Sequence, residues 1–273
     1  MQCVIDEREV HVEYVEPTVI ANDAVPAAIV LLHGAANDHR AWLPVAPGLA
    51  RAGYAVYAPD LPAHGGSGGS LCTAVASMAA WVLKLLDACG LERCALAGHS
   101  MGSLVALHAA GLAPQRISHL ALVGTAWPMR VAPALLELAQ SQTDVALRNM
   151  AIWSHMQREG QPLQPALVQQ TLELMQSVQQ AGCAQGNVLA TDLAACNAYA
   201  NALDMAARVR VPAAFILGEH DRMTPTKATQ RLREALPQAR LTTLDAGHAL
   251  MSEAPGAVVH ALAALLALPA ERP

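Results

Sequence analysis

A glycine-flanked serine stands at the centre of the stretch between residues 95 and 106. The stretch consists of an apolar strand pattern, the residues Gly98-His99-Ser100-Met101-Gly102 and an apolar helix pattern. In a Gly-x-Ser-x-Gly pattern the serine lies on a sharp strand-to-helix turn that exposes its hydroxyl, and the glycines let the backbone fold back closely. The N–H of Met101 would then lie at a helix N-terminus, where the helix dipole favours a developing negative charge. The pattern therefore predicts Ser100 as a nucleophile.

A serine hydroxyl is a weak nucleophile at neutral pH, so it needs a histidine as base and a carboxylate that orients the histidine. The turn at residues 218–225 supplies the acids Glu219 and Asp221, and the turn at residues 245–249 supplies His248. The chain order is therefore serine, acid, histidine. The alternative for Asp221 is a helix N-cap, and the alternative acid in the same turn is Glu219. A further acid, Asp245, lies too near His248 in sequence to point at it easily.

Strand and helix patterns alternate along most of the chain. Continuous apolar runs predict strands, and apolar residues at helical spacing predict helices between them. An alternating segment at residues 4–15 predicts a hairpin at the sheet edge. The alternation implies a mostly parallel sheet with helices on both faces, and ligands bind such sheets at the carboxyl ends of the strands. The expected strands are 27–32, 54–58, 93–97, 117–123, 215–218 and 241–244, and the expected helices are 42–49, 73–89, 101–111, 227–236 and 256–268.

The alternation breaks between residues 127 and 203. Four segments there (132–140, 144–157, 165–180 and 188–203) show helical periodicity, and no strand pattern occurs. We interpret this region as a helical insertion that covers the serine. Met150, Trp153 and Met156 fall on one helical face, which is typical of core packing. As an alternative, they line a pocket for an apolar substrate group.

The chain resembles the α/β-hydrolase superfamily over nearly its whole length, because several motifs occur in the order that this superfamily uses. One departure is Ala63, which replaces the first glycine of the loop usually written D-x-x-G-H-G-x-S. The motifs are His33-Gly34 followed by Trp42, Asp60-Leu61-Pro62-Ala63-His64-Gly65-Gly66-Ser67, Gly98 to Gly102, Gly218 to Asp221 and Gly247-His248.

The resemblance implies an α/β fold with a core formed by residues 1–126 and 204–273 and a cap at residues 127–203. It implies a catalytic triad of Ser100, Asp221 and His248, and an oxyanion hole formed by the backbone N–H groups of Ala35 and Met101. His33, His99, Met150, Trp153 and Met156 are candidates for substrate contact. We expect His33 and His99 to be hydrogen-bonded beside the site rather than catalytic, and His64 to stabilise a turn.

The expected reaction is hydrolysis of a small to medium, largely apolar carboxylic ester through an acyl-enzyme, with no cofactor and no metal. Enzymes with the same triad also cleave lactones, thioesters or activated carbon–carbon bonds, or make peracids, so these reactions remain alternatives. A different class is a non-enzymatic receptor for a small ligand on the same scaffold. The histidines show no H-E-x-x-H pattern and no clustered ligand spacing, which predicts no metal site.

Composition restricts the partners and the location. The chain has 273 residues, of which 53% are hydrophobic and 14% charged, so it can bury a large core. Its net charge of −5 and the lack of a basic cluster predict no nucleic-acid or membrane partner. We expect a cytoplasmic protein, because no signal peptide pattern occurs at the N-terminus, and six reduced core cysteines, because their spacing shows no pairing pattern.

Overall fold

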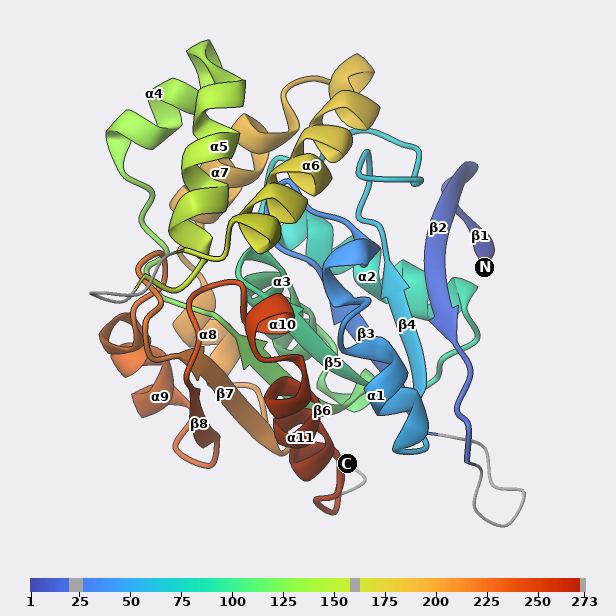
Figure 1. The fold of residues 1–273 in the computed structure, drawn as a ribbon. Helices are drawn as coiled ribbons and strands as arrows, with labels where there is room; N and C mark the ends of the chain where they lie inside the picture. Colours follow the sequence, from blue (N-terminus) through green and yellow to red (C-terminus); the bar gives the residue numbers. More distant parts are fainter. Residues whose placement is uncertain (20–26, 158–162, 271–273) are drawn as a thin grey trace.

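The computed structural model describes residues 1–19, 27–157 and 163–270. Its centre is a single sheet of eight strands (Figure 1). The strands are β1 (Gln2–Ile5), β2 (Arg8–Val15), β3 (Ala28–Leu32), β4 (Ala55–Pro59), β5 (Cys94–His99), β6 (Ile117–Val123), β7 (Ala213–Gly218) and β8 (Arg240–Leu244).

The strands lie in the order β1-β2-β4-β3-β5-β6-β7-β8. The two N-terminal strands join the edge antiparallel, and every pair from β4 to β8 is parallel. Strand β5 lies between β3 and β6 and is buried along its whole length. A strand covered on both faces consists of an unbroken apolar run, which explains its pattern in the sequence. The predicted mostly parallel sheet with an edge hairpin is confirmed.

Helices cover both faces of the sheet and form two separate apolar cores. One core contains Met78, Leu104 and Met205 from α2, α3 and α8, and the other contains Leu49 and Leu262 from α1 and α11. These helices position the loops at the carboxyl ends of the strands. Their bounds are α1 (Ala46–Arg51), α2 (Val75–Ala88), α3 (Met101–Leu112), α8 (Ala202–Ala206), α9 (Gln230–Ala235), α10 (Leu250–Glu253) and α11 (Pro255–Leu266).

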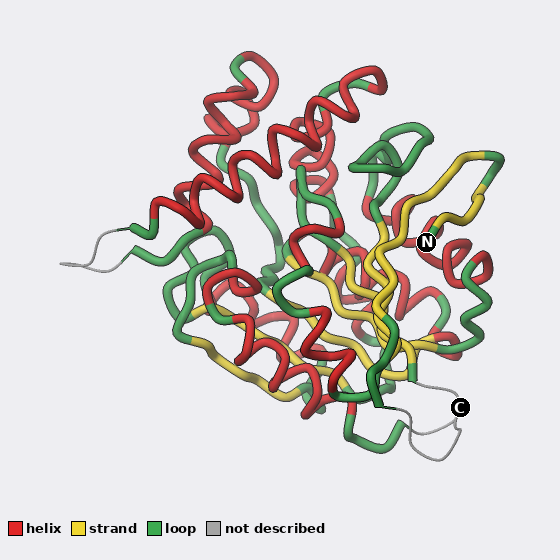
Figure 2. The backbone as a smooth tube through the Cα atoms, turned by 45° about the vertical axis from the view of Figure 1, so that its right-hand side comes forward, coloured by secondary structure: helices red, strands yellow, loops and turns green. Residues whose placement is uncertain are grey.

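Four more helices follow β6 and gather at one end of the sheet (Figure 1). They are α4 (Pro133–Ser141), α5 (Thr143–Ser154), α6 (Pro165–Gly182) and α7 (Val188–Ala198). The turned view of Figure 2 shows that they stand clear of the strands. Between β6 and β7 the described residues form helices and no strand, as the sequence predicts.

Some predicted helices are divided. The helix expected at residues 42–49 is a short 3-10 helix η1 (His39–Trp42) followed by α1. Pro44 lacks a backbone N–H and interrupts the helix, whereas Pro47 occupies the first turn of α1, where no donor is needed. The helix expected at residues 188–203 ends at Ala198, because Tyr199 is extended, and α8 then packs on α3. Three more 3-10 helices are η2 (Pro114–Arg116), η3 (Cys183–Gln185) and η4 (Thr226–Thr229).

Two local features differ from expectation. All six cysteines are free, but Cys183 is exposed, so the expectation of core placement is wrong for this residue. Ala63 has a φ of 63°, a left-handed conformation that glycine adopts at no steric cost and alanine does not. Among the residues that the structure describes, no helix combines the length and the apolarity needed to cross a bilayer.

Candidate active site

Ser100 forms the turn between β5 and α3. Its φ of 52° and ψ of −117° lie in a region that residues with a side chain rarely adopt. Its N–H donates a hydrogen bond of 2.9 Å to the carbonyl of Val123 in β6. A Cβ on Gly98 would collide with the carbonyl of Gly102, and a Cβ on Gly102 would collide with the carbonyl of Leu32. These close backbone contacts require glycine at both positions, which is the physical basis of the sequence pattern.

His248 and Asp221 lie in the loops that follow β8 and β7. The ring Nδ1 of His248 lies 2.8 Å from Oδ2 of Asp221, and both residues are buried. A carboxylate can only accept, so Nδ1 carries a hydrogen and Nε2 of the neutral ring keeps a free lone pair. The other two candidate acids are placed differently. Glu219 is exposed, and Asp245 lies 3.1 Å from the ring of His220.

The carboxylate of Asp221 is held by the turn that follows it. Its Oδ1 accepts the backbone N–H groups of Met223 and Thr224 at 2.8 and 2.7 Å. The hydroxyl of Thr224 lies 2.7 Å from Oδ2 of Asp221, 2.9 Å from the carbonyl of Gly124 and 3.1 Å from Nδ1 of His248. Sequence reasoning missed Thr224. The sequence feature that could have identified Thr224 is its position three residues after Asp221. An aspartate carboxylate readily accepts hydrogen bonds from backbone N–H groups two and three residues later in the chain.

These contacts determine the charge of Asp221. Burial alone would raise the pKa of Asp221, but the neighbouring His248 and the hydrogen bonds from His248 and Thr224 bring this pKa well below its usual value. The carboxylate therefore stays ionised at neutral pH. An ionised partner at Nδ1 stabilises the positive charge that His248 acquires when its Nε2 takes a proton.

His99, the residue before Ser100, supports the loop of His248. Its Nε2 donates a hydrogen bond of 2.9 Å to the backbone carbonyl of His248, and the two ring centroids are 4.7 Å apart. Its Nδ1 is buried beside Gly34 and has no hydrogen-bond partner among the described residues. Burial, reinforced by the nearby His248, lowers the pKa of His99 to about 3. The neutral ring therefore fixes the backbone of the histidine loop.

Two cavities meet at Ser100. Both are lined by Ser100, His248, Ala35, Met150 and Met223. Both cavities have mixed linings in which apolar surface predominates. The first is lined further by Asn37, Arg40, His99, Gln170 and Thr171, and the second by Met129, Leu135, Trp153, Leu193 and Arg222, among others.

The remaining predicted site residues occupy different places. Ala35 lies at both cavities, and Met101 is the first residue of α3, with its side chain fully buried. Met156 lies beyond the end of α5 rather than on its face, and its N–H donates to Glu253. It lines neither cavity.

His33 also lines neither cavity, and it is fully buried. Its Nδ1 donates to the carbonyl of Gly34 at 2.9 Å, and its Nε2 accepts the N–H of Leu61 at 3.0 Å. Burial, followed by the proximity of His64, lowers the pKa of His33 to about 4. His33 therefore links the loop after β3 to the loop after β4 as a neutral ring.

A buried ion pair that links α7 to the loops after β3 and β4 was not predicted. Oδ2 of Asp192 accepts the backbone N–H of Ala36 at 2.8 Å and lies 2.9 Å from Nε2 of His64. Nδ1 of His64 lies 3.0 Å from the carbonyl of Pro62, so both ring nitrogens face acceptors. Burial would lower the pKa of His64, but Asp192 raises it overall. No local signal reveals this pair, because its members are 128 residues apart.

Among the described residues, three groups of histidines and carboxylates could hold a metal ion. They involve His39 or His220, and none of them includes Ser100 or His248. Neither His39 nor His220 lines the two cavities. The site at Ser100 thus consists of a hydroxyl, an imidazole and a carboxylate.

Comparison with known proteins places the chain among hydrolases. The family model of the alpha/beta hydrolase fold matches residues 27–255. The pimeloyl-[acyl-carrier protein] methyl ester esterase of Chromobacterium violaceum is 31% identical over 224 residues, which cover 78% of this chain and 83% of that protein. The dihydrolipoyllysine-residue acetyltransferase component of the acetoin cleaving system of Pseudomonas putida is 44% identical over 99 residues. This match covers 36% of the chain but only 26% of that relative.

Solved structures share the fold at low sequence identity. The enol-lactonase from Burkholderia xenovorans has a TM-score of 0.83 at 22% identity, and the alignment covers 98% of this chain and 100% of that chain. An esterase from Exiguobacterium antarcticum has a TM-score of 0.80 at 18% identity, covering 96% of this chain and 97% of that chain. Such low identities show the fold alone, whereas the family match covers most of the sequence. The chain belongs to the alpha/beta hydrolase fold family.

Proposed function

We propose that the protein is a serine hydrolase that cleaves a small to medium, largely apolar carboxylic ester through an acyl-enzyme. The observation that carries the proposal is the 2.8 Å hydrogen bond between His248 and Asp221 at a site where both His248 and Ser100 line the same two cavities. Residues 1–126 and 204–273 form the catalytic core in this proposal, and residues 127–203 form the cap.

In the proposed reaction His248 is the general base. Its Nδ1 is occupied by Asp221, so Nε2 takes the proton of Ser100 as the hydroxyl attacks the ester carbonyl. The same nitrogen then returns the proton to the leaving alcohol. A water molecule, activated in the same way, attacks the acyl-enzyme and releases the acid. The ionised Asp221 stabilises the imidazolium in both steps.

The N–H groups of Ala35 and Met101 are the proposed donors to the oxyanion. Met101 begins α3, so its N–H is one of those left without a partner at a helix N-terminus. The peptide that follows Ala35 is held by the bond from the N–H of Ala36 to Asp192. Fixed donors of this kind stabilise the charge that develops on the carbonyl oxygen.

The two cavities that meet at Ser100 offer space for the two sides of an ester. The second cavity, with Met129, Leu135 and Leu193 in its lining, suits an apolar chain. The relatives include a methyl ester esterase and an enol-lactonase by name. Lactones, thioesters, activated carbon–carbon bonds and peracid formation remain the alternative reactions, and ligand binding without turnover is the alternative class.

A substrate panel tests this proposal. Wild-type protein, Ser100→Ala and the exposed cap variant Ser141→Ala are assayed on p-nitrophenyl esters of increasing acyl length and on a series of lactones. We expect turnover by wild type and by Ser141→Ala, and a loss on the order of 10⁶-fold in kcat for Ser100→Ala. A fluorophosphonate probe should label wild type and leave Ser100→Ala unlabelled.

Retained turnover by a folded Ser100→Ala variant would refute the assignment of the nucleophile. Labelling of wild type without turnover of any ester or lactone would favour the receptor. Faster turnover of lactones than of every open-chain ester would assign the protein to the lactonase alternative.

A further inference from the structure

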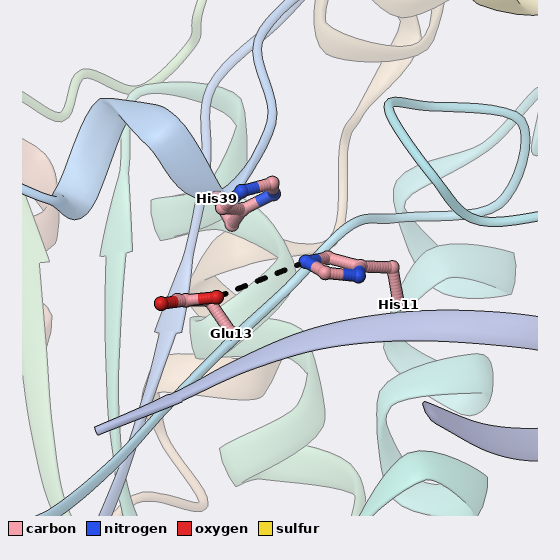
Figure 3. Close-up of side chains that lie close together, drawn as sticks. All are labelled: His11, Glu13 and His39. Atoms are coloured by element: carbon pink, nitrogen blue, oxygen red, sulfur yellow. Dashed lines mark ion pairs between the residues drawn. The ribbon is translucent and has the colours of Figure 1, made fainter. Parts of the chain in front are cut away.

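Three side chains with metal-binding groups converge beside strand β2, outside both cavities. His11 and Glu13 are two residues apart on β2, so they lie on the same face of the strand, while Val10 and Val12 point into the core. His39 reaches the same place from η1 (Figure 3). The sequence predicts no metal site, because it shows no H-E-x-x-H pattern and no clustered ligand spacing. His39 is distant from the other two residues along the chain.

The distances within this group suit a single ion. A ring nitrogen of each histidine and a carboxylate oxygen of Glu13 lie within 4.8 Å of one another. Nε2 of His11 lies 4.0 Å from Oε2 of Glu13. A dashed line in Figure 3 marks this ion pair. Nε2 of His11 is buried and has no hydrogen-bond partner among the described residues. A buried ring nitrogen without a partner is uncommon, and a cation at this position would satisfy it.

His39 is oriented by a buried carboxylate. Oδ1 of Asp60 accepts both the backbone N–H and the Nδ1 hydrogen of His39, at 2.8 and 2.7 Å. The second oxygen of Asp60 accepts the N–H of Gly66 at 2.8 Å, and Asp60 has no exposed surface. With Nδ1 engaged, Nε2 of His39 is the nitrogen available to a metal ion. Histidines that bind metals are commonly held by such a carboxylate.

We propose that His11, Glu13 and His39 bind a divalent transition-metal ion, for which Zn²⁺ is the best match. Two imidazoles and one carboxylate form a ligand set that zinc accepts, with water in the fourth position. Zinc–ligand bonds of about 2.1 Å place tetrahedral ligands about 3.4 Å apart, so the group contracts modestly around the ion. The side chains of His11 and Glu13 are 24% and 38% exposed, which leaves them room to move.

The ion would act as a structural clamp. It would join strand β2, which lies next to the edge strand β1, to η1, and through Asp60 to the loop after β4. None of its three ligands lines a cavity at Ser100, so metal binding does not depend on the proposed hydrolysis.

Calorimetric titration of the full chain with ZnCl₂ tests the site. The variants are His11→Gln and Glu13→Gln, both of similar size to the wild-type residue and both on a partly exposed strand. The matched control is His220→Gln, which removes the histidine of a second group formed with Glu219 and Asp245. Circular dichroism verifies that each variant is folded, and visible absorption with CoCl₂ reports the coordination of the ion.

We expect wild type and His220→Gln to bind Zn²⁺ equally. His11→Gln and Glu13→Gln should each bind Zn²⁺ at least about 10-fold more weakly. The Co²⁺ spectrum of wild type should be that of a four-coordinate ion. Three results would each overturn the proposal. The first is a wild-type Kd for Zn²⁺ of about 1 mM or weaker. The second is wild-type affinity in both His11→Gln and Glu13→Gln, and the third is a loss of affinity confined to His220→Gln.

Discussion

The carboxylate of Asp221 accepts more hydrogen bonds than its histidine partner alone supplies. Two backbone N–H groups fix Oδ1, while His248 and the hydroxyl of Thr224 meet at Oδ2. Thr224 also contacts the carbonyl of Gly124, which belongs to the loop after β6. Thr224 is therefore a positioning residue in the proposed site. Its hydroxyl connects Asp221, His248 and a neighbouring loop, and the residue also lines the second cavity.

Replacing Thr224 by valine should slow the reaction without weakening substrate binding. A hydrogen bond to a charged group contributes about 1.5–3 kcal/mol, so we expect kcat to fall by about 10- to 100-fold while KM changes little. Thr224→Ser keeps the hydroxyl and should restore most of the activity. Steady-state kinetics on the best ester of the panel measures both parameters. Equal rates for the valine and serine variants would contradict this role.

The predictability of the site differs from residue to residue. Ser100, Asp221 and His248 each lie in a short motif at the end of a strand, so local patterns suffice to nominate them. The hydrogen bond from Thr224 to Asp221 could be predicted from their spacing within one turn. The contact of Thr224 with Gly124 could not, because it depends on how β6 and β7 pair. Such a contact follows from tertiary structure and has no signature in the sequence.

At the scale of elements, helix α7 of the proposed cap is anchored to the loop after β4 by the bond between Asp192 and His64. Both side chains are buried, and the same carboxylate oxygen also holds the N–H of Ala36. Removing one partner of a buried ion pair leaves the other charge uncompensated, which is strongly destabilising. The anchor therefore couples the packing of the cap to the loop that carries Ala35.

Asp192→Asn should lower the free energy of unfolding by about 3 kcal/mol. The double variant Asp192→Asn/His64→Gln should recover part of this loss, because it also removes the charge of His64 that Asp192→Asn leaves uncompensated. Glu137→Gln, an exposed substitution on α4, should stay within about 0.5 kcal/mol of wild type. Denaturant unfolding measures all three. An Asp192→Asn variant as stable as wild type would show that the anchor carries no stabilising energy.

The sequence predicts the sheet well and the helices between β6 and β7 only in outline. Alternating apolar runs and helical spacing define the strands, because burial on both faces leaves a strong pattern. The helices between β6 and β7 show the same periodicity, but periodicity does not show which part of the structure each helical face contacts. Met150 lines the cavities, whereas Met156 falls beyond the end of α5, although both fit the same expected helical face.

At the scale of the molecule, buried histidines make stability depend on pH. Burial lowers the pKa of His33 to about 4 and that of His99 to about 3. In the unfolded chain both have a pKa near the usual value of about 6.5. The unfolded state therefore binds more protons below that pH, and the folded state loses stability as the pH falls. His64 has a raised pKa, so its contribution is fully present below pH 6.5 and is lost only at higher pH.

The free energy of unfolding should therefore decrease between about pH 6.5 and pH 5, by up to about 1.4 kcal/mol per pH unit for each of the two neutral histidines. Denaturant unfolding at a series of pH values measures the slope. Proton NMR of the folded protein should show that the ring signals of His33 and His99 do not titrate in this range. A flat stability profile together with titrating rings would disprove the expected linkage.

Exchange of the proposed cap of this protein for that of another family member has to respect the contact between α7 and the loop after β4. A cap without a carboxylate at the position of Asp192 would leave residue 64 as a buried histidine with no counter-charge. A chimera of this core with another cap therefore needs position 64 changed in the same step. Conversely, a cap taken from this protein carries its carboxylate into the new host, and only a core with a cationic or hydrogen-donating residue at that loop can accept it.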